Sequence, residues 1–166
     1  MKRSPPPAKP AVLAALLRQL EQDLEAAKEA QRTVSEGATH EESRPENDKD
    51  TRALEASYLA RGLAQRVADI AAALAAARGL SERALAPGAP VGAGTLVTLE
   101  DDEGELALVF LVPLGGGARL QVAGHEVKVV SPHAPLGEAL LGRHVGDDVE
   151  LRTPRGPREL VVMEVR

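Results

Sequence analysis

Residues 130–149 read VSPHAPLGEALLGRHVGDDV, and this stretch decides how the C-terminal half of the chain folds. Pro132 ends the preceding strand, because proline has a fixed φ and no N–H to donate to a sheet. Pro135 suits the first position of a helix, and Gly142 suits the residue just after its end. Gly146 predicts a turn into a further strand. The stretch therefore predicts a strand end, a one-turn helix and a turn into another strand.

Apolar residues alternate with polar ones on both sides of this stretch, which is typical of strands with one buried face. Gly104 and Gly115–Gly117 predict hairpin turns between them. We expect a small, twisted antiparallel sheet with the short helix packed on it. The predicted strands are Thr95–Glu100, Glu105–Leu114, Leu120–Val122, His125–Val130, Asp148–Arg152 and Glu159–Val165.

The N-terminal half has a helical period instead, with apolar positions at alternating steps of four and three. The two series mirror each other, which predicts an antiparallel coiled-coil hairpin folded about residues 43 and 44. Alanine replaces leucine toward the tip, so we expect the distal end to be the looser one. Gly62 predicts a close approach of the two helices. The first series is Leu13, Leu17, Leu20, Leu24, Ala27, Gln31 and Val34, and the second is Ala53, Ala56, Ala60, Leu63, Val67, Ile70, Leu74 and Ala77.

The fold class is therefore α+β, with a helical hairpin followed by a small β domain. Gly, Pro and Ala residues mark the boundary between the two periods. Pro45 blocks a continuous helix at the tip, and Asp50 or Asn47 is suited to cap the second helix. The predicted segments are a flexible tail at 1–10, the hairpin at 11–78 with an acidic tip at 37–50, a linker at 79–94 and the C-terminal domain at 95–166.

Composition excludes several classes of protein. The 166 residues carry a formal net charge of −5, which argues against a protein that binds duplex DNA through a strong basic face. Aromatic residues make up 1%, which disfavours RNA-recognition domains and prolyl isomerases. The chain has no cysteine, so thiol chemistry is excluded and a cytoplasmic location is expected. No apolar run is long enough to cross a membrane.

No conventional active site is present in the sequence. The four histidines lack both the helical spacing of a zinc pair and a neighbouring nucleophile motif. Gly115–Gly117 is not followed by the Lys and Ser or Thr of a phosphate-binding loop. We therefore expect no cofactor of its own and no small-molecule substrate.

Residues 131–149 and the following Thr-Pro-Arg-Gly at 153–156 resemble the C-terminal signature of the bacterial Gre-type (GreA/GreB) transcript cleavage and elongation factors, SPxSPLGxALLGxxxGDxV followed by TPxG. One departure is Ala134 in place of the usual serine, which removes the N-cap of the short helix and should cost about 1 kcal/mol. The resemblance implies an FKBP-like C-terminal domain.

The resemblance also implies a function. A Gre factor is not an enzyme: it binds RNA polymerase at the rim of the secondary channel and passes its coiled coil down that channel. The acidic tip then helps the polymerase hold Mg²⁺ and cut backtracked nascent RNA; DNA is contacted at most indirectly. The polymerase-binding residues would lie around the signature, at Ser131, Pro132, Pro135, Leu136 and Gly137.

At the tip the family motif GDLxENAEY is matched only by Glu46 and Asn47, and Ser43 stands where the family has its metal-ligating Asp. Hard Mg²⁺ prefers oxygen ligands, so Glu46 with Asp50 is the expected metal pair. Asp48 and Glu42 are the other candidates for the missing acid, and the sequence leaves open which of them acts. Lys28, Arg32, Arg44 and Arg52 are candidates for guiding RNA.

Two alternatives stay open at this point. A chain with the wrong tip could occupy the same channel and regulate the polymerase without stimulating cleavage. A third hypothesis is an FKBP-like prolyl isomerase or chaperone with a helical dimerisation arm, against which the scarcity of aromatic residues argues.

Overall fold

The computed structural model describes residues 5–41 and 49–166, with side chains described except at 38–41, 49 and 50. The chain divides into two compact units. One consists of residues 1–17 and 75–166, and the other of residues 18–74. The predicted α+β class is confirmed, because two long helices precede a six-stranded sheet that carries one short helix.

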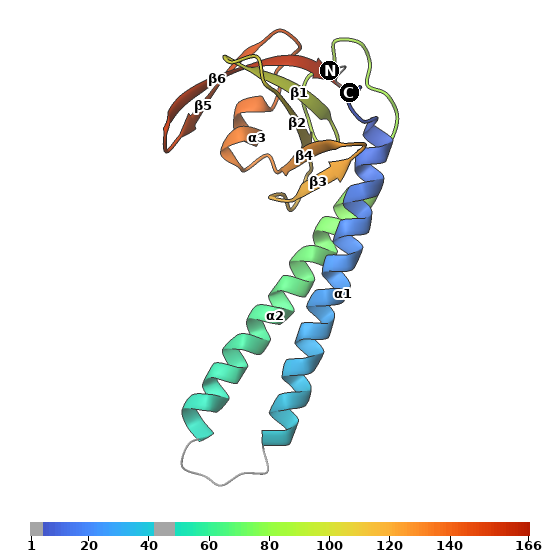
Figure 1. Ribbon diagram of the computed structural model, residues 1–166. Helices are drawn as coiled ribbons and strands as arrows, with labels where there is room; N and C mark the ends of the chain where they lie inside the picture. Colours follow the sequence, from blue (N-terminus) through green and yellow to red (C-terminus); the bar gives the residue numbers. More distant parts are fainter. Residues whose placement is uncertain (1–4, 42–48) are drawn as a thin grey trace. The chain divides into compact units, whose positions relative to one another are not determined.

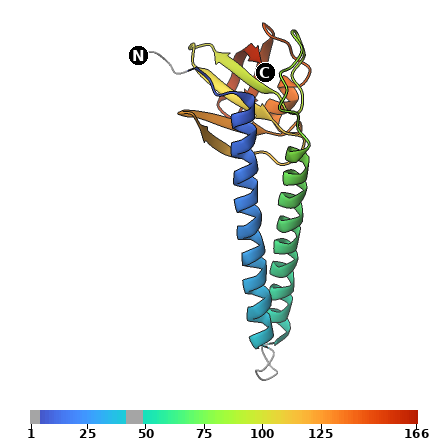
Figure 2. The ribbon, with the colours of Figure 1, turned by 90° about the vertical axis from the view of Figure 1, so that its right-hand side faces the viewer.

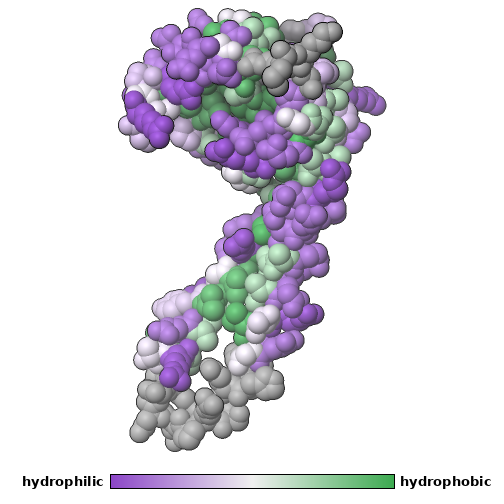
Figure 3. All heavy atoms as spheres, in the orientation of Figure 1, coloured by the Kyte–Doolittle hydropathy of each residue, from purple (hydrophilic) through white to green (hydrophobic). Residues whose placement is uncertain are grey.

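The unit of residues 18–74 contains most of two helices. They are α1 (Lys9–Glu41) and α2 (Lys49–Arg78), which lie side by side in both views (Figures 1 and 2). Figure 3 shows hydrophobic residues between the two helices and hydrophilic ones along their outer edges. Within the described residues, no helix is long and apolar enough to span a bilayer.

Most of the predicted seam coincides with buried or half-buried positions of the two helices, although Val12, Leu16 and Ala73 are buried outside it. Every predicted seam residue from Leu20 to Val34 and from Ala56 to Leu74 is buried or half-buried, whereas most of their neighbours are exposed. Ala53 departs from the pattern, since it is exposed. The hairpin is thus held together by the small and apolar side chains that the heptad period predicts.

The helices run further toward the tip than the sequence predicts. The connection was expected at Gly37–Asp50, but α1 continues through Gly37 to Glu41 and α2 already includes Asp50. Asp50 is therefore not the N-cap of α2, and Asn47 lies outside the described residues. A single helical glycine costs only about 1 kcal/mol relative to alanine, so Gly37 does not end α1.

Gly62 does not have the packing role that its position suggests. A Cβ atom built there would have no neighbour within 4 Å, so the glycine does not mark a close approach of the helices. The prediction of such an approach was wrong, because Gly62 is exposed while the seam passes through Ala60 and Leu63.

Replacing Gly62 by alanine is therefore expected to stabilise the hairpin by about 1 kcal/mol, the difference in helix propensity between the two residues. Hydrogen exchange at the amides of α2 measures this directly. Slower exchange is expected in α2 with no change in the sheet, and faster exchange would show that the glycine relieves a clash.

The sheet belongs to the other unit and has the strand order β3-β4-β2-β1-β6-β5 (Figure 1). Four of the six strands lie within one residue of the predicted bounds at both ends, and β4 has the predicted bounds. Strand β2 ends three residues earlier than predicted, and β6 begins three residues earlier. The strands are β1 (Leu96–Asp101), β2 (Leu106–Leu111), β3 (Arg119–Val122), β4 (His125–Val130), β5 (Asp148–Thr153) and β6 (Gly156–Val165).

One pairing differs from the expected antiparallel sheet. Strands β2 and β4 pair in parallel, from Leu108 opposite Val127 to Leu111 opposite Val130. Strand β3 pairs with β4 and not with β2, so Gly115–Gly117 is no hairpin turn. It begins a crossover that carries the chain past β4 to the edge of the sheet, because parallel neighbours cannot be joined by a tight turn.

The short helix α3 (Pro135–Leu140) lies over one face of this sheet. Its Leu140 is fully buried together with inward-facing residues of five strands, among them Val97, Val109, Val149 and Val162. Leu136 and Ala139 pack against the same cluster. The core on this face is built from leucine and valine alone, as the composition requires.

The linker that precedes the sheet is tied to the turn after α3. Val91 donates its N–H to the carbonyl oxygen of Arg143 at 2.8 Å and accepts the N–H of Gly142 at 2.9 Å. Val91 is buried in the core cluster below α3. These contacts fix the segment that leaves α3, and so help to hold the signature stretch in place.

Candidate functional site

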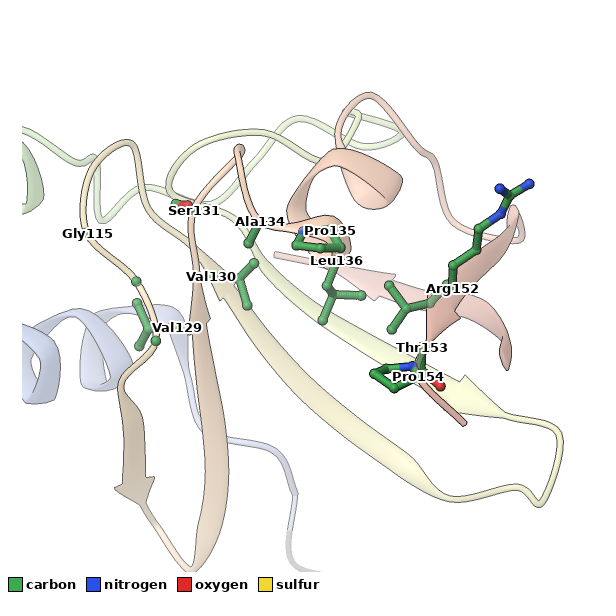
Figure 4. A pocket seen from close by; sticks show the side chains of 13 residues that line it. Gly115, Val129, Val130, Ser131, Ala134, Pro135, Leu136, Arg152, Thr153 and Pro154 are labelled. Carbon is green, nitrogen blue, oxygen red and sulfur yellow. The ribbon is translucent and has the colours of Figure 1, made fainter. Parts of the chain in front are cut away.

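A groove lies along the signature stretch, in the unit that contains the sheet. It has a volume of about 350 Å³ and is lined mainly by apolar side chains and glycines (Figure 4). Its walls come from the crossover after β2, the end of β4, the start of α3 and the β5–β6 hairpin. The lining residues are Gly115, Gly116, Gly117, Val129, Val130, Ser131, Ala134, Pro135, Leu136, Leu151, Arg152, Thr153 and Pro154.

Two glycines hold the backbone of Ser131 at one side of the groove. A Cβ atom on Gly116 would lie 2.9 Å from the backbone nitrogen of Ser131, and one on Gly137 would overlap the Ser131 carbonyl oxygen. The same carbonyl oxygen accepts the N–H of Ala134 at 3.1 Å. The strand therefore passes into α3 through a turn that is too tight for a side chain at Gly137.

The β5–β6 hairpin forms the opposite wall. Thr153 pairs with Gly156 across a two-residue turn, and the Thr153 hydroxyl donates to the Gly156 carbonyl oxygen at 2.7 Å. Gly156 has a φ of +118°, which disfavours any residue with a side chain. The Thr-Pro-Arg-Gly sequence thus sets the position of Thr153 and Pro154 along the groove.

Charge is confined to the edge of the groove. The Arg152 side chain is 93% exposed, and in Figure 4 it points away from the apolar residues. Its Nε lies 3.8 Å from an oxygen of Glu150, an exposed pair that contributes little to stability. An apolar side chain of a partner could enter the groove without burying a charge.

The start of α3 lacks a cap, as predicted. Ala134 occupies the N-cap position with extended backbone and makes no capping hydrogen bond. Its N–H donates to Ser131, while its carbonyl oxygen accepts the N–H of Glu138 at 2.9 Å. The first turn of the helix is held by proline geometry and by packing of Leu136.

Replacing Ala134 by serine is expected to raise the free energy of unfolding of this unit by about 1 kcal/mol, because the hydroxyl can accept a backbone N–H of the first turn. Slower hydrogen exchange at the amides of residues 138–141 measures the gain. Ala139→Ser, inside the same helix, is the control and should give no such gain.

Three of the five residues predicted to bind a partner line the groove together: Ser131, Pro135 and Leu136. Pro132 and Gly137 do not line it, and Gly137 is buried beneath Ser131. Sequence reasoning missed the wall formed by Gly115–Gly117 and by Leu151–Pro154. The Thr-Pro-Arg-Gly motif was the available signal for the second wall.

The side chains of the acidic residues predicted at the tip are not among those that the structure describes. Glu42, Glu46 and Asp48 lie outside the described residues, and Asp50 is described only as part of the backbone of α2. The assignment of Mg²⁺ ligands among them stays a prediction. Elsewhere, in the part of the chain whose side chains are described, no three acidic or histidine residues gather as a metal site.

The basic residues predicted on the hairpin are largely neutralised where they are described. Lys28 pairs with Glu25 at 2.9 Å, and Arg32 hydrogen-bonds to Glu29 and lies near Glu36. The hydrogen bond to Glu29 raises the pKa of the Arg32 guanidinium. Arg52 also has a partner, and Arg44 lies outside the described residues. This set of side chains offers little free positive charge.

Comparison with known proteins identifies the groove-bearing half of the chain. Residues 86–166 match the model of the GreA/GreB transcription elongation factor C-terminal domain. Over 155 residues the chain is 34% identical to the transcription inhibitor protein Gfh1 of Thermus aquaticus, which covers 90% of this chain and 89% of Gfh1. This chain belongs to the Gre family of transcription factors.

Other Gre-family relatives match in different ways. The transcription elongation factor GreA of Syntrophobacter fumaroxidans is 38% identical over 74 residues, so the chain spans 44% of that protein's length. A crystal structure of Thermus aquaticus Gfh1 is 23% identical over 90% of this chain and 92% of that one, with a TM-score of 0.41. The Gfh1 sequence match is long enough to include most of the hairpin, whereas the GreA match covers less than half of the chain.

Proposed function

We propose that this protein binds RNA polymerase through the groove beside α3 and regulates transcription by placing its hairpin in the polymerase's secondary channel, without stimulating transcript cleavage. The observation that carries the proposal is the match to a protein named as a transcription inhibitor over about nine-tenths of both chains. Ser43, in the place of the metal-ligating Asp expected of a cleavage factor, points the same way.

The groove supports the binding half of the proposal. It is concave, apolar and bounded by the residues of the family signature, and such a surface suits an apolar side chain from a partner protein. The charged Arg152 lies at the rim, where a carboxylate of the partner would meet it in solvent. Exposed pairs of this kind affect association rate more than affinity.

A second candidate function is stimulation of cleavage, as in the cleavage-active Gre factors. The acid-rich tip sequence favours it, since Glu42, Glu46, Asp48 and Asp50 supply the carboxylate oxygens that Mg²⁺ prefers. In that case Glu46 and Asp50 would hold Mg²⁺ jointly with the polymerase. The ion would stabilise the attacking and leaving oxygens of the RNA phosphate.

A transcript assay on backtracked elongation complexes separates the two functions. With the protein added, we expect unchanged RNA length after stalling and a reduced yield of run-off transcript on a complete template. If the protein shortens the RNA and the Glu46→Ala and Asp50→Ala variants do not, the proposal is contradicted and the second candidate is established. Failure of the protein to co-purify with polymerase would exclude both.

A further inference from the structure

The outward side of α2 carries an apolar pair that the fold does not use. Tyr58 is 60% exposed and Leu54, one turn before it, is 54% exposed. At about 100° per residue both lie on the side of the helix opposite the seam residues Ala60 and Leu63. This side of a two-helix hairpin is normally polar, so folding gives no reason for an aromatic residue there.

Free positive charge lies beside the ring. The guanidinium carbon of Arg61 is 5.9 Å from the centre of the Tyr58 ring, within the range of a cation–π contact. In contrast to Lys28 and Arg32, Arg61 forms no ion pair with a carboxylate among the side chains that the structure describes. Arg61 can therefore offer its charge to an anionic group bound beside the ring.

Gly62 leaves the side of the ring away from Arg61 uncovered. Side chains of a helix point back toward its N-terminus, so a side chain at position 62 would lie over Tyr58, four residues earlier. The space where that side chain would begin is empty to 4 Å. A glycine inside a helix weakens it, and packing against α1 does not account for this one.

We propose that Tyr58, Arg61 and Gly62 form a stacking site for one base of single-stranded RNA. The ring offers a flat face of the kind on which nucleobases stack, Gly62 keeps that face open, and Arg61 can contact the adjoining phosphate or the base. This inference rests on the proposed function in one respect: polymerase binding would bring the protein close to single-stranded RNA, because the transcript is single-stranded. Its test needs no polymerase.

Tyr58 is the only tyrosine of the chain, which also has no tryptophan, so its fluorescence reports on this site alone. The free protein is titrated with an octamer of uridylate, with the matching DNA octamer and with an abasic ribose-phosphate octamer. We expect RNA to quench the tyrosine emission and the abasic chain to leave it unchanged. Equal quenching by the abasic chain, or none by RNA, would overturn the proposal; quenching by DNA as well as RNA would assign the site to both nucleic acids.

Variants then test each part of the site by anisotropy of labelled RNA. Tyr58→Phe should keep the affinity, and Tyr58→Ala should lower it about tenfold, since stacking on an aromatic side chain is lost. Gly62→Leu should lower it while slowing hydrogen exchange in α2. Leu59→Ala, at a residue that is 54% exposed on the neighbouring side, is the control and should change nothing.

The outcomes are distinct from those of the proposed function. If Tyr58→Ala leaves RNA affinity unchanged but weakens polymerase binding, the surface contacts protein and the stacking site is disproved. If the groove variant Leu136→Glu abolishes polymerase binding while RNA still quenches Tyr58, both conclusions hold independently.

Discussion

Replacement of Gly137 by alanine is expected to lower the free energy of unfolding of the sheet-bearing unit by at least about 3 kcal/mol. The added methyl group would overlap the carbonyl oxygen of Ser131 and crowd its carbonyl carbon. Both neighbours are backbone atoms, so no side chain can rotate away to make room. Either α3 must move off the sheet, which exposes Leu140, or the turn at Ser131 must open.

Hydrogen exchange followed by mass spectrometry measures this loss for each unit separately. Peptides from β1 and β2 should exchange faster in Gly137→Ala, while peptides from residues 18–36 of α1 should be unchanged. Gly62→Ala is the matched control, since it adds the same methyl group to a helical glycine that has free space. Unchanged exchange in β1 would mean that the chain relaxes around Ser131 without loss, contrary to the structure.

A charge in the groove should weaken polymerase binding strongly. We expect Leu136→Glu to lower the affinity for RNA polymerase at least about 30-fold, the effect of losing one central contact of an interface. Leu136 lines the groove and packs on the core, and a carboxylate there would have to be buried without a partner when the complex forms. Surface plasmon resonance with immobilised polymerase gives the affinity.

The control for this prediction lies on the same short segment. Leu141 is 51% exposed and does not line the groove, so Leu141→Glu should bind polymerase as the wild type does. Unchanged hydrogen exchange in β1 and β2 shows that Leu136→Glu is folded. Equal loss of affinity in both variants would place the contact outside the groove, and no loss in either would refute the groove as the docking site.

Much of this fold could be predicted because local patterns determine it. The bounds of β4, from His125 to Val130, and most of the heptad seam could be predicted, since buried positions recur with the period of each element. The uncapped start of α3 at Ala134 followed from the chemistry of a single side chain.

Pairing between distant segments could not be predicted in the same way. Alternation marks a strand but not the direction of its neighbour, so the parallel pair of β2 and β4 was not foreseen. For the same reason the sequence did not predict that Gly115–Gly117 forms one wall of the groove. The prediction that Gly62 packs closely against α1 was also wrong. The sequence shows that α2 contains a glycine, but it does not show which atoms of α1 lie near it.

Strand β6 follows the other five strands in the sequence but lies inside the sheet, between β1 and β5. Until a ribosome has released this strand, one edge of β1 has no hydrogen-bonding partner, including the Leu96 backbone that pairs with Arg166 at 2.7 Å and 2.9 Å. A nascent chain would thus carry an open, apolar strand edge from the time β1 has emerged until β6 has followed it. Removal of β6 should therefore yield aggregates and not a smaller folded domain.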